Sequence, residues 1–184
     1  TSMNQSAMGE SFLSRQPVLN HQDDLVGYEL TLMGEPANPS SAQASAAMLV
    51  CAAYTELGIR SALGRNTAFL RVDSQFLHDD AIETLPADAV VLELAIDSVP
   101  DKRTIDRCRF LRERRYSLAL ADYTGLDDRS RPLLTMLDVV KINTREHGHC
   151  TLNDLAAPLT RLPLKLLAQG VESREEADRC LEMG

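Results

Sequence analysis

Charged side chains in this chain stand within or just after short apolar runs. The residues in this position are Glu29, Arg71, Glu93, Asp122 and Lys141. Short apolar runs without a helical period are typical of strands that are buried on both faces. In barrels and open α/β sheets, ligands bind at the carboxyl ends of such strands. These acids and bases are therefore the residues that could serve binding or catalysis.

The five side chains are expected to converge. Alternate residues of neighbouring barrel strands point into one interior, which predicts that all five lie near one mouth. Three carboxylates held close together repel one another unless cations lie among them. We therefore predict that Arg71 and Lys141 balance the acids. On this basis Arg71→Ala is expected to destabilise the domain by well over about 1 kcal/mol.

Short apolar runs alternate with helical segments along the rest of the chain. The runs are Ala68–Arg71, Val90–Leu94, Leu118–Leu120, Val139–Asn143 and Leu164–Ala168. Roughly 15 to 25 residues with helical signals separate them, as in repeated βαβ units. The pattern predicts a parallel α/β fold, and a closed barrel in preference to an open sheet.

The start of the chain differs from this alternation. Phe12–Leu19 and Leu25–Leu32 are strand-like and flank a polar turn, which predicts a β-hairpin. Pro17 predicts that the first strand lies at an edge or pairs irregularly. The expected helices run from Ser40 or Ser41 to Gly58, from Gln75 to Leu85, from Pro100 past Leu111, over Asp127–Leu137 with an early break at Pro132, over Thr151–Leu162, and over Ser173–Met183.

Composition limits the class of protein. The chain has 184 residues, 44% of them hydrophobic, which is enough for one domain. We assign residues 12–184 to this domain and residues 1–11 to a disordered tail or an expression remnant. The formal charge of -8 argues against a nucleic-acid surface and against an anionic membrane face. The cysteines form no C-x-x-C pair and no long apolar segment is present, which predicts a reduced, cytoplasmic protein.

Several ordered segments together resemble one family. They are G-Y-E-L at 27–30, V-L-E-L at 91–94, A-L-A-D-Y at 119–123, V-V-K-I-N at 139–143 and L-L-A-Q-G-V-E at 166–172. In this order and spacing they resemble the EAL domains of bacterial cyclic di-GMP phosphodiesterases. The opening S-R-Q-P-V-L-N-H-Q-D-D-L-V-G-Y-E-L is similar to the degenerate EAL half of bacterial proteins that join it to an HDOD domain.

The resemblance implies a TIM-like β/α barrel with one antiparallel strand. Active members hold two divalent metals at the carboxyl ends of the strands, where both oxygens of an in-line displacement are neutralised. Met33 stands where the family usually has an arginine that suits a phosphate contact. The family residues that are kept are Glu29, Glu93, Asp122, Lys141 and Glu172. Those changed at metal-side positions are Arg71, Ala121 and Gln169.

The substitution by Arg71 weighs most against metal binding. A fixed positive charge about 5 Å from a divalent ion is unfavourable by roughly 7 kcal/mol at an effective dielectric constant near 20. We therefore expect no bound metal, no cofactor and no catalytic residue in this chain. The resemblance then implies a catalytically inactive signalling or regulatory module that acts through a protein partner or through self-association. Two alternatives are a receptor that binds cyclic di-GMP without hydrolysis and, third in rank, an active phosphodiesterase.

Simpler interpretations of the same residues stay open at this point. The charged residues could face solvent at the strand ends, and Asp122 could be a turn or helix-cap residue. The segment 147–150 (H-G-H-C) could suggest zinc, but it has no second ligand cluster at a usable spacing. We interpret it as a polar loop.

The chain offers seven strands, whereas the family continues past the last helix into an eighth strand. An uncovered strand edge recruits other chains. We therefore predict that the protein self-associates, borrows a segment, or rearranges its N-terminal hairpin to cover the gap beside the strand at 164–168.

Overall fold

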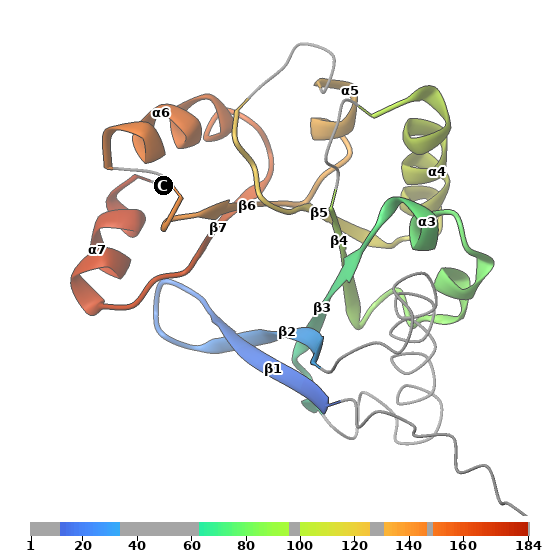
Figure 1. Cartoon of the computed structure of the whole chain (residues 1–184), viewed down its shortest axis with the longest axis horizontal. Coiled ribbons are helices and arrows are strands. Elements are labelled where there is room, and N and C mark those ends of the chain that lie inside the picture. The colour runs from blue at the N-terminus through green and yellow to red at the C-terminus, as the bar shows by residue number, and fades with distance from the viewer. Residues whose placement is uncertain (1–11, 34–62, 96–99, 126–130, 147–148, 184) are drawn as a thin grey trace, which may run out of the picture.

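One curled sheet of seven strands organises the molecule (Figure 1). The computed structural model describes residues 12–33, 63–95, 100–125, 131–146 and 149–183. The strands follow one another in chain order, β1 to β2 antiparallel and every later pair parallel. Their bounds are β1 Phe12–Leu19, β2 Leu25–Met33, β3 Thr67–Val72, β4 Val90–Leu94, β5 Ser117–Leu120, β6 Val139–Asn143 and β7 Lys165–Gln169. The predicted α/β fold and hairpin are confirmed, and among the described strands the sheet forms a half-barrel.

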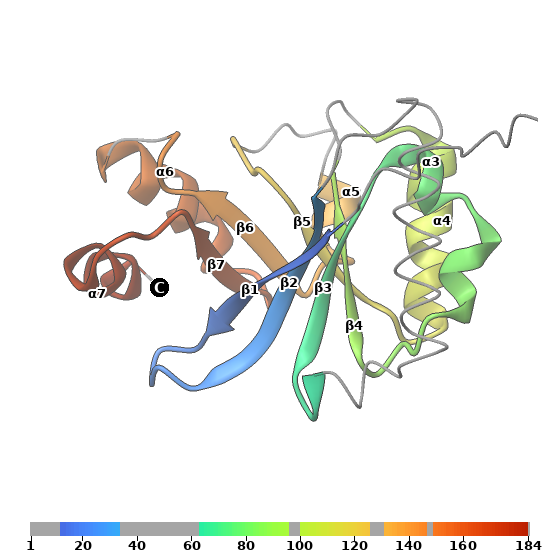
Figure 2. The same cartoon turned by 60° about the horizontal axis from the view of Figure 1, so that its bottom comes forward.

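Helices lie along the convex side of this sheet (Figures 1 and 2). They are α3 Ser74–Leu77, the 3-10 helix η1 Asp80–Thr84, α4 Lys102–Glu113, α5 Arg131–Leu134, α6 His149–Leu159 and α7 Arg174–Glu182. No helix in the described ranges is both long enough and apolar enough to cross a membrane. The helix predicted between Ser40 and Gly58 lies outside the described residues.

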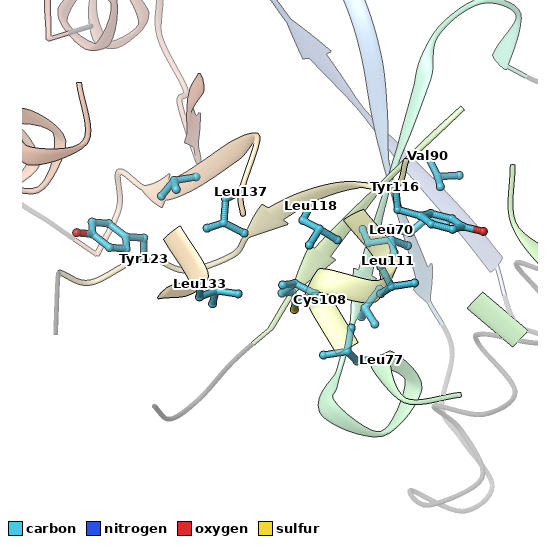
Figure 3. Close-up of a cluster of buried hydrophobic side chains, with 14 of the residues drawn as sticks. Leu70, Leu77, Val90, Cys108, Leu111, Tyr116, Leu118, Tyr123, Leu133 and Leu137 are labelled. Carbon is cyan, nitrogen blue, oxygen red and sulfur yellow. The ribbon is translucent and has the colours of Figure 1, made fainter. Parts of the chain in front are cut away.

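Strand alternation divides the apolar side chains between two faces. One set packs under the helices and includes Leu70, Leu118 and Tyr116 (Figure 3). The Tyr116 hydroxyl lies within hydrogen-bond distance of the backbone oxygens of Ile82 in η1 and of Leu85, and donates to one of them. The other set is a small cluster on the concave face. Its buried members are Phe69, Val91, Ala119 and Val139, with Val18 and Leu167 packed against them. The same alternation that forms this cluster places the charged residues beside it.

Two predicted helices need correction. The segment Gln75–Leu85 is not one helix, because the side chain of Asp79 accepts a hydrogen bond from the Ala81 N–H and begins a separate 3-10 helix. The first part of the helix predicted over Asp127–Leu137, at 127–130, lies outside the described residues. Helix α5 ends at Leu134, three residues before the predicted end.

The other helices lie close to their predicted positions. Asp101 caps α4 by accepting from the Thr104 N–H at 2.8 Å, and Ser173 caps α7 by accepting from the Glu176 N–H at 3.2 Å. Helix α6 begins at His149 and ends at Leu159, slightly earlier at both ends than predicted. Asp and Ser side chains at these positions satisfy backbone donors that would otherwise lack partners.

The two ends of the sheet approach each other without pairing. Among the described strands, β1 pairs with β2 alone and β7 with β6 alone, so Pro17 does lie on an edge strand. The turn between β1 and β2 contacts the first turn of α7, where Arg174 donates to the Asp23 carboxylate. The N-terminal hairpin therefore leans toward the C-terminal helix across the open side of the half-barrel.

Candidate functional site

The charged residues of the concave face come from neighbouring strands. In the sheet register, Arg71 of β3 lies beside Glu93 of β4, and Glu93 lies beside Ala119 of β5. Lys141 of β6 and Glu29 of β2 belong to the same set, and Asp122 lies two residues after the end of β5. Parallel strands bring their carboxyl ends to the same edge of a sheet, so residues far apart in the sequence meet there.

Lys141 is the centre of the site. Its Nζ lies 2.7 Å from Glu93 Oε1 and 3.1 Å from Glu29 Oε2. The side chains of Lys141 and Glu93 are 1% and 0% exposed, and that of Glu29 is 14% exposed. Such charges are almost never buried unless they are paired. Solvent-facing strand ends are therefore the wrong interpretation for these three residues.

Arg71 forms the outer part of the same network. Its Nη2 lies 2.5 Å from Asp122 Oδ2, and its Nη1 lies 4.0 Å from Glu93 Oε1. The side chains of Arg71 and Asp122 are 47% and 40% exposed, so this pair borders solvent. The structure thus joins all five predicted side chains in one continuous chain of ion pairs.

Asp122 is also a turn residue. Its φ of 49° lies in the left-handed region, which side chains other than glycine rarely adopt and which aspartate tolerates better than most. The ion pair with Arg71 holds the carboxylate while the backbone turns away from β5. Both interpretations of Asp122, as a charge of the site and as a turn residue, are correct.

The remaining predicted positions do not join this network. Ala121 is buried, and its N–H donates to the Leu94 carbonyl at 3.0 Å. Glu172 lies on the surface and accepts from Arg145, whose Nε also donates to the Gly170 carbonyl at 3.3 Å. Sequence reasoning missed Arg145, because nothing in its spacing from β6 distinguishes it from an ordinary loop arginine.

Two buried acceptor atoms in this region have no hydrogen-bond partner among the described residues. They are Oε2 of Glu93 and Oε1 of Gln169. A buried acceptor without a donor is destabilising by about 1 to 3 kcal/mol. Burial is also the main reason why the pKa of Glu93 is raised, and the attraction of Lys141 only partly opposes it. Burial lowers the pKa of Arg71, but Asp122 and the other acids raise it by more.

The site offers a poor donor set for a divalent metal. Within the described residues, no three His, Cys, Asp or Glu side chains are arranged to hold a metal ion. Glu29 and Glu93 face the ammonium group of Lys141, and Asp122 faces the guanidinium group of Arg71. A divalent cation would have to displace these fixed positive charges. What the arrangement can do, on its own residues, is hold the strand ends together by charge.

The exposure of Arg71 changes the expected result of removing it. Arg71→Ala should lower the free energy of unfolding by about 1 kcal/mol, because half-exposed ion pairs are screened by water. This loss in free energy of unfolding is smaller than the loss predicted from the sequence, because that prediction assumed a partly buried Arg71. Urea denaturation measures the change, and Arg145→Ala, which breaks the more exposed pair with Glu172, is the matched control with an effect near zero. An unchanged midpoint for Arg71→Ala would mean that the Arg71–Asp122 pair does not stabilise the fold.

The chain is similar in sequence to known bacterial proteins. No family model matches the chain. It is 23% identical over 180 residues to YuxH of Bacillus subtilis, an uncharacterised protein, and 26% identical over 190 residues to the cyclic di-GMP phosphodiesterase CdgJ of Vibrio cholerae. These matches cover 94% and 98% of this chain but only 44% and 43% of the relatives. The chain therefore spans less than half the length of these relatives.

Solved structures share the fold at low sequence identity. The phosphodiesterase PaMucR in complex with cyclic di-GMP has a TM-score of 0.76 at 16% identity, over 95% of this chain and 91% of that one. The EAL enzyme Bd1971 in its cGMP-bound form has a TM-score of 0.74 at 15% identity, over 95% of this chain and 59% of that one. A standalone EAL protein of Vibrio cholerae scores 0.71 at 17% identity, over 97% of this chain and 89% of that one. The chain has the TIM-like fold of EAL domains.

Proposed function

We propose that this EAL-fold chain is related to cyclic di-GMP phosphodiesterases but catalytically inactive, and that it acts as a signalling module through contacts with protein. One observation carries the proposal: the guanidinium group of Arg71, which by the resemblance stands in place of a metal ligand, pairs with Asp122 at 2.5 Å and lies 4.0 Å from Glu93. A fixed positive charge therefore lies among the acids that a metal ion would need as ligands. The fold supplies a stable frame, and function depends on the site that it carries.

The residues do not fit the two metals of the active family members. By the resemblance, Arg71, Ala121 and Gln169 stand where oxygen ligands would be needed. An arginine and an alanine provide no ligand at all, and divalent ions such as Mg²⁺ require several oxygens that converge. The guanidinium of Arg71 also lies 4.0 Å from Glu93, close enough to repel any cation placed there.

The direct test is a hydrolysis assay. We expect no cleavage of cyclic di-GMP above a metal-free blank when magnesium or manganese is added. Product analysis over a range of metal and protein concentrations measures this. Glu29→Ala is the control, because a real metal-dependent activity should disappear in that variant. Turnover in the unmodified protein that is lost in Glu29→Ala would contradict the proposal.

A receptor that binds cyclic di-GMP without hydrolysis is the second candidate. The observation in its favour is that Arg71 and Arg145, half exposed or more at the carboxyl ends of β3 and β6, could each offer a guanidinium group to phosphate. Against it, both groups are already paired with carboxylates, and Met33 replaces the family arginine. Isothermal titration with cyclic di-GMP separates the candidates: the signalling-module proposal expects no heat of binding, whereas a receptor binds in a manner that Arg71→Ala weakens.

A further inference from the structure

Helix α4 carries positive charge on an acidic chain. Residues 101–115, which contain this helix and its two ends, hold seven of the 19 Lys and Arg residues and three of the 27 Asp and Glu residues. Their net charge is +4, and because the whole chain carries -8, the remaining residues carry -12. Helix α4 lies on the opposite side of the molecule from β7 and α7 (Figures 1 and 2). Among the described helices, it is the one to which an anionic partner is drawn most strongly.

Three arginines lie along one side of α4. Arg103, Arg107 and Arg114 follow one another at intervals of four and seven residues, and such positions share one face of a helix. Phe110 lies on the same face between them. Its ring centroid is 5.0 Å from the guanidinium carbon of Arg107 and 4.4 Å from that of Arg114. These four residues, here called the arginine stripe, extend from the first turn of α4 to its C-cap, about 17 Å.

The middle of the arginine stripe is held in place by contacts with the rest of the domain. The Arg107 guanidinium group donates to the carbonyl oxygens of Leu77 at 2.9 Å and of Asp79 at 3.1 Å. Phe110 packs against the main core, and its ring orients the two guanidinium groups beside it by cation–π attraction. A side chain that is already ordered loses little conformational entropy when it binds a partner. The stripe is therefore preorganised for binding.

Glu83 shows which chemistry the arginine stripe binds. Its Oε1 lies 3.0 Å from Arg107 Nη1 and its Oε2 lies 3.1 Å from Arg114 Nη1, so one carboxylate bridges two guanidinium groups. The stripe keeps a net charge of +2 after this pairing. Arg103 is exposed and forms no ion pair with another described residue, and the side chain of Arg114 is 53% exposed. The two ends of the stripe can therefore accept further carboxylates.

The charge of the stripe also acts on its neighbour His78. The pKa of this imidazole is lowered, first by burial and then by repulsion from Arg103 and Arg107. The electrostatic potential beside the first half of α4 is therefore positive, although Asp101 opposes it.

We propose that the arginine stripe is a docking surface for an acidic segment of a partner protein. This inference rests on the proposed function, signalling through contacts with protein, and adds the surface and the chemistry of the partner. Asp or Glu side chains of the partner segment pair with Arg103 and with the exposed part of Arg114. Arginine and aromatic side chains are enriched among the residues that contribute most to binding at protein interfaces.

The surrounding charge favours an acidic protein segment over a nucleic acid. Proteins that bind DNA mainly by charge make about 6 to 10 phosphate contacts, whereas the stripe has a net charge of only +2. Asp106 and Glu113 are exposed on the same helix, and the rest of the chain would repel a long polyanion. A short acidic peptide avoids this repulsion, because charges beyond about 10 Å are largely screened at moderate salt.

Fluorescence anisotropy with a labelled polyglutamate peptide tests this surface. We expect the peptide to bind the protein at low ionic strength and to dissociate as salt is added. Arg103→Glu should weaken binding roughly fivefold or more, because it places a like charge opposite the peptide. Arg161→Glu is the matched control. It makes the same charge change at an exposed residue just after α6, and it should change the affinity less than about twofold.

A second pair of variants tests for a gain of binding. Glu83→Gln removes the chain's own carboxylate from Arg107 and Arg114, so it should strengthen binding of the peptide roughly twofold or more. Glu175→Gln makes the same charge change at an exposed ion pair with Arg179 on α7, and it should leave the affinity unchanged. Circular dichroism confirms that each variant is folded.

Four results would overturn the proposal. They are no binding of the peptide at low ionic strength, equal weakening by Arg103→Glu and Arg161→Glu, an affinity that Glu83→Gln leaves unchanged, and tighter binding of a single-stranded oligonucleotide of the same charge than of the peptide. The hydrolysis assay tests the proposed function separately, so a failure of that function is distinguishable from a failure of this docking surface.

Discussion

Lys141→Met should lower the free energy of unfolding by about 3 to 5 kcal/mol, the range measured when one partner of a buried ion pair is removed. Lys141 is 1% exposed and its ammonium group contacts both Glu29 and Glu93. Without it, two carboxylates remain close together, one of them fully buried, and the nearest remaining cation of the network is the half-exposed Arg71. Methionine fills a similar volume, so the loss reports charge rather than a cavity.

Urea denaturation at neutral pH measures this effect, and two further variants sharpen it. Arg109→Met breaks an ion pair of similar length, 2.7 Å to Asp106, but both side chains are more than half exposed. It should change stability by less than about 1 kcal/mol. The double variant Lys141→Met with Glu93→Gln should be more stable than Lys141→Met alone, because it removes the buried unpaired charge. A loss of less than about 1 kcal/mol in Lys141→Met would show that the pair is not stabilising.

The convergence of the site could be predicted because it follows from periodicity. Glu93 and Lys141 lie within apolar runs whose alternation sets one face apart from the other, and parallel strands align their ends. That is enough to bring Arg71, Glu93 and Lys141 together without any knowledge of side-chain packing. The same reasoning gave the hairpin and the position of Pro17 on an edge.

The pairing within the site could not be predicted, because it depends on reach and burial. The sequence does not show that Lys141 is buried while Arg71 borders solvent. The substitution expected to lower the free energy of unfolding most is therefore that of Lys141 and not, as predicted from the sequence, that of Arg71. Arg145 was missed because its partner, Glu172, lies on a different loop. The division of 75–85 into α3 and η1 rests on a single side chain, Asp79, whose capping role competes with an otherwise continuous helical pattern.

The stability of the domain should also depend on pH through Glu93. Burial raises the pKa of this carboxyl above its ordinary value of 4.5, although Lys141 draws it down. A carboxyl with a higher pKa in the folded protein binds its proton more tightly when folded. Its stabilising contribution is therefore complete below the unfolded pKa, and it is lost as the pH rises through the folded pKa. The slope in this window is at most about 1.4 kcal/mol per pH unit.

Glu93→Gln isolates this contribution, because glutamine has a similar shape and does not titrate. The difference in free energy of unfolding, unmodified protein minus Glu93→Gln, should decrease as the pH rises from about 4.5 and should level off above the folded pKa. Acids elsewhere on the surface cancel in the difference. In a Lys141→Met background the decrease should extend to higher pH, since the ammonium group no longer lowers the pKa of Glu93. A difference that stays flat or increases with pH would contradict a raised pKa at Glu93, and with it the dominance of burial over ion pairing at the centre of the site.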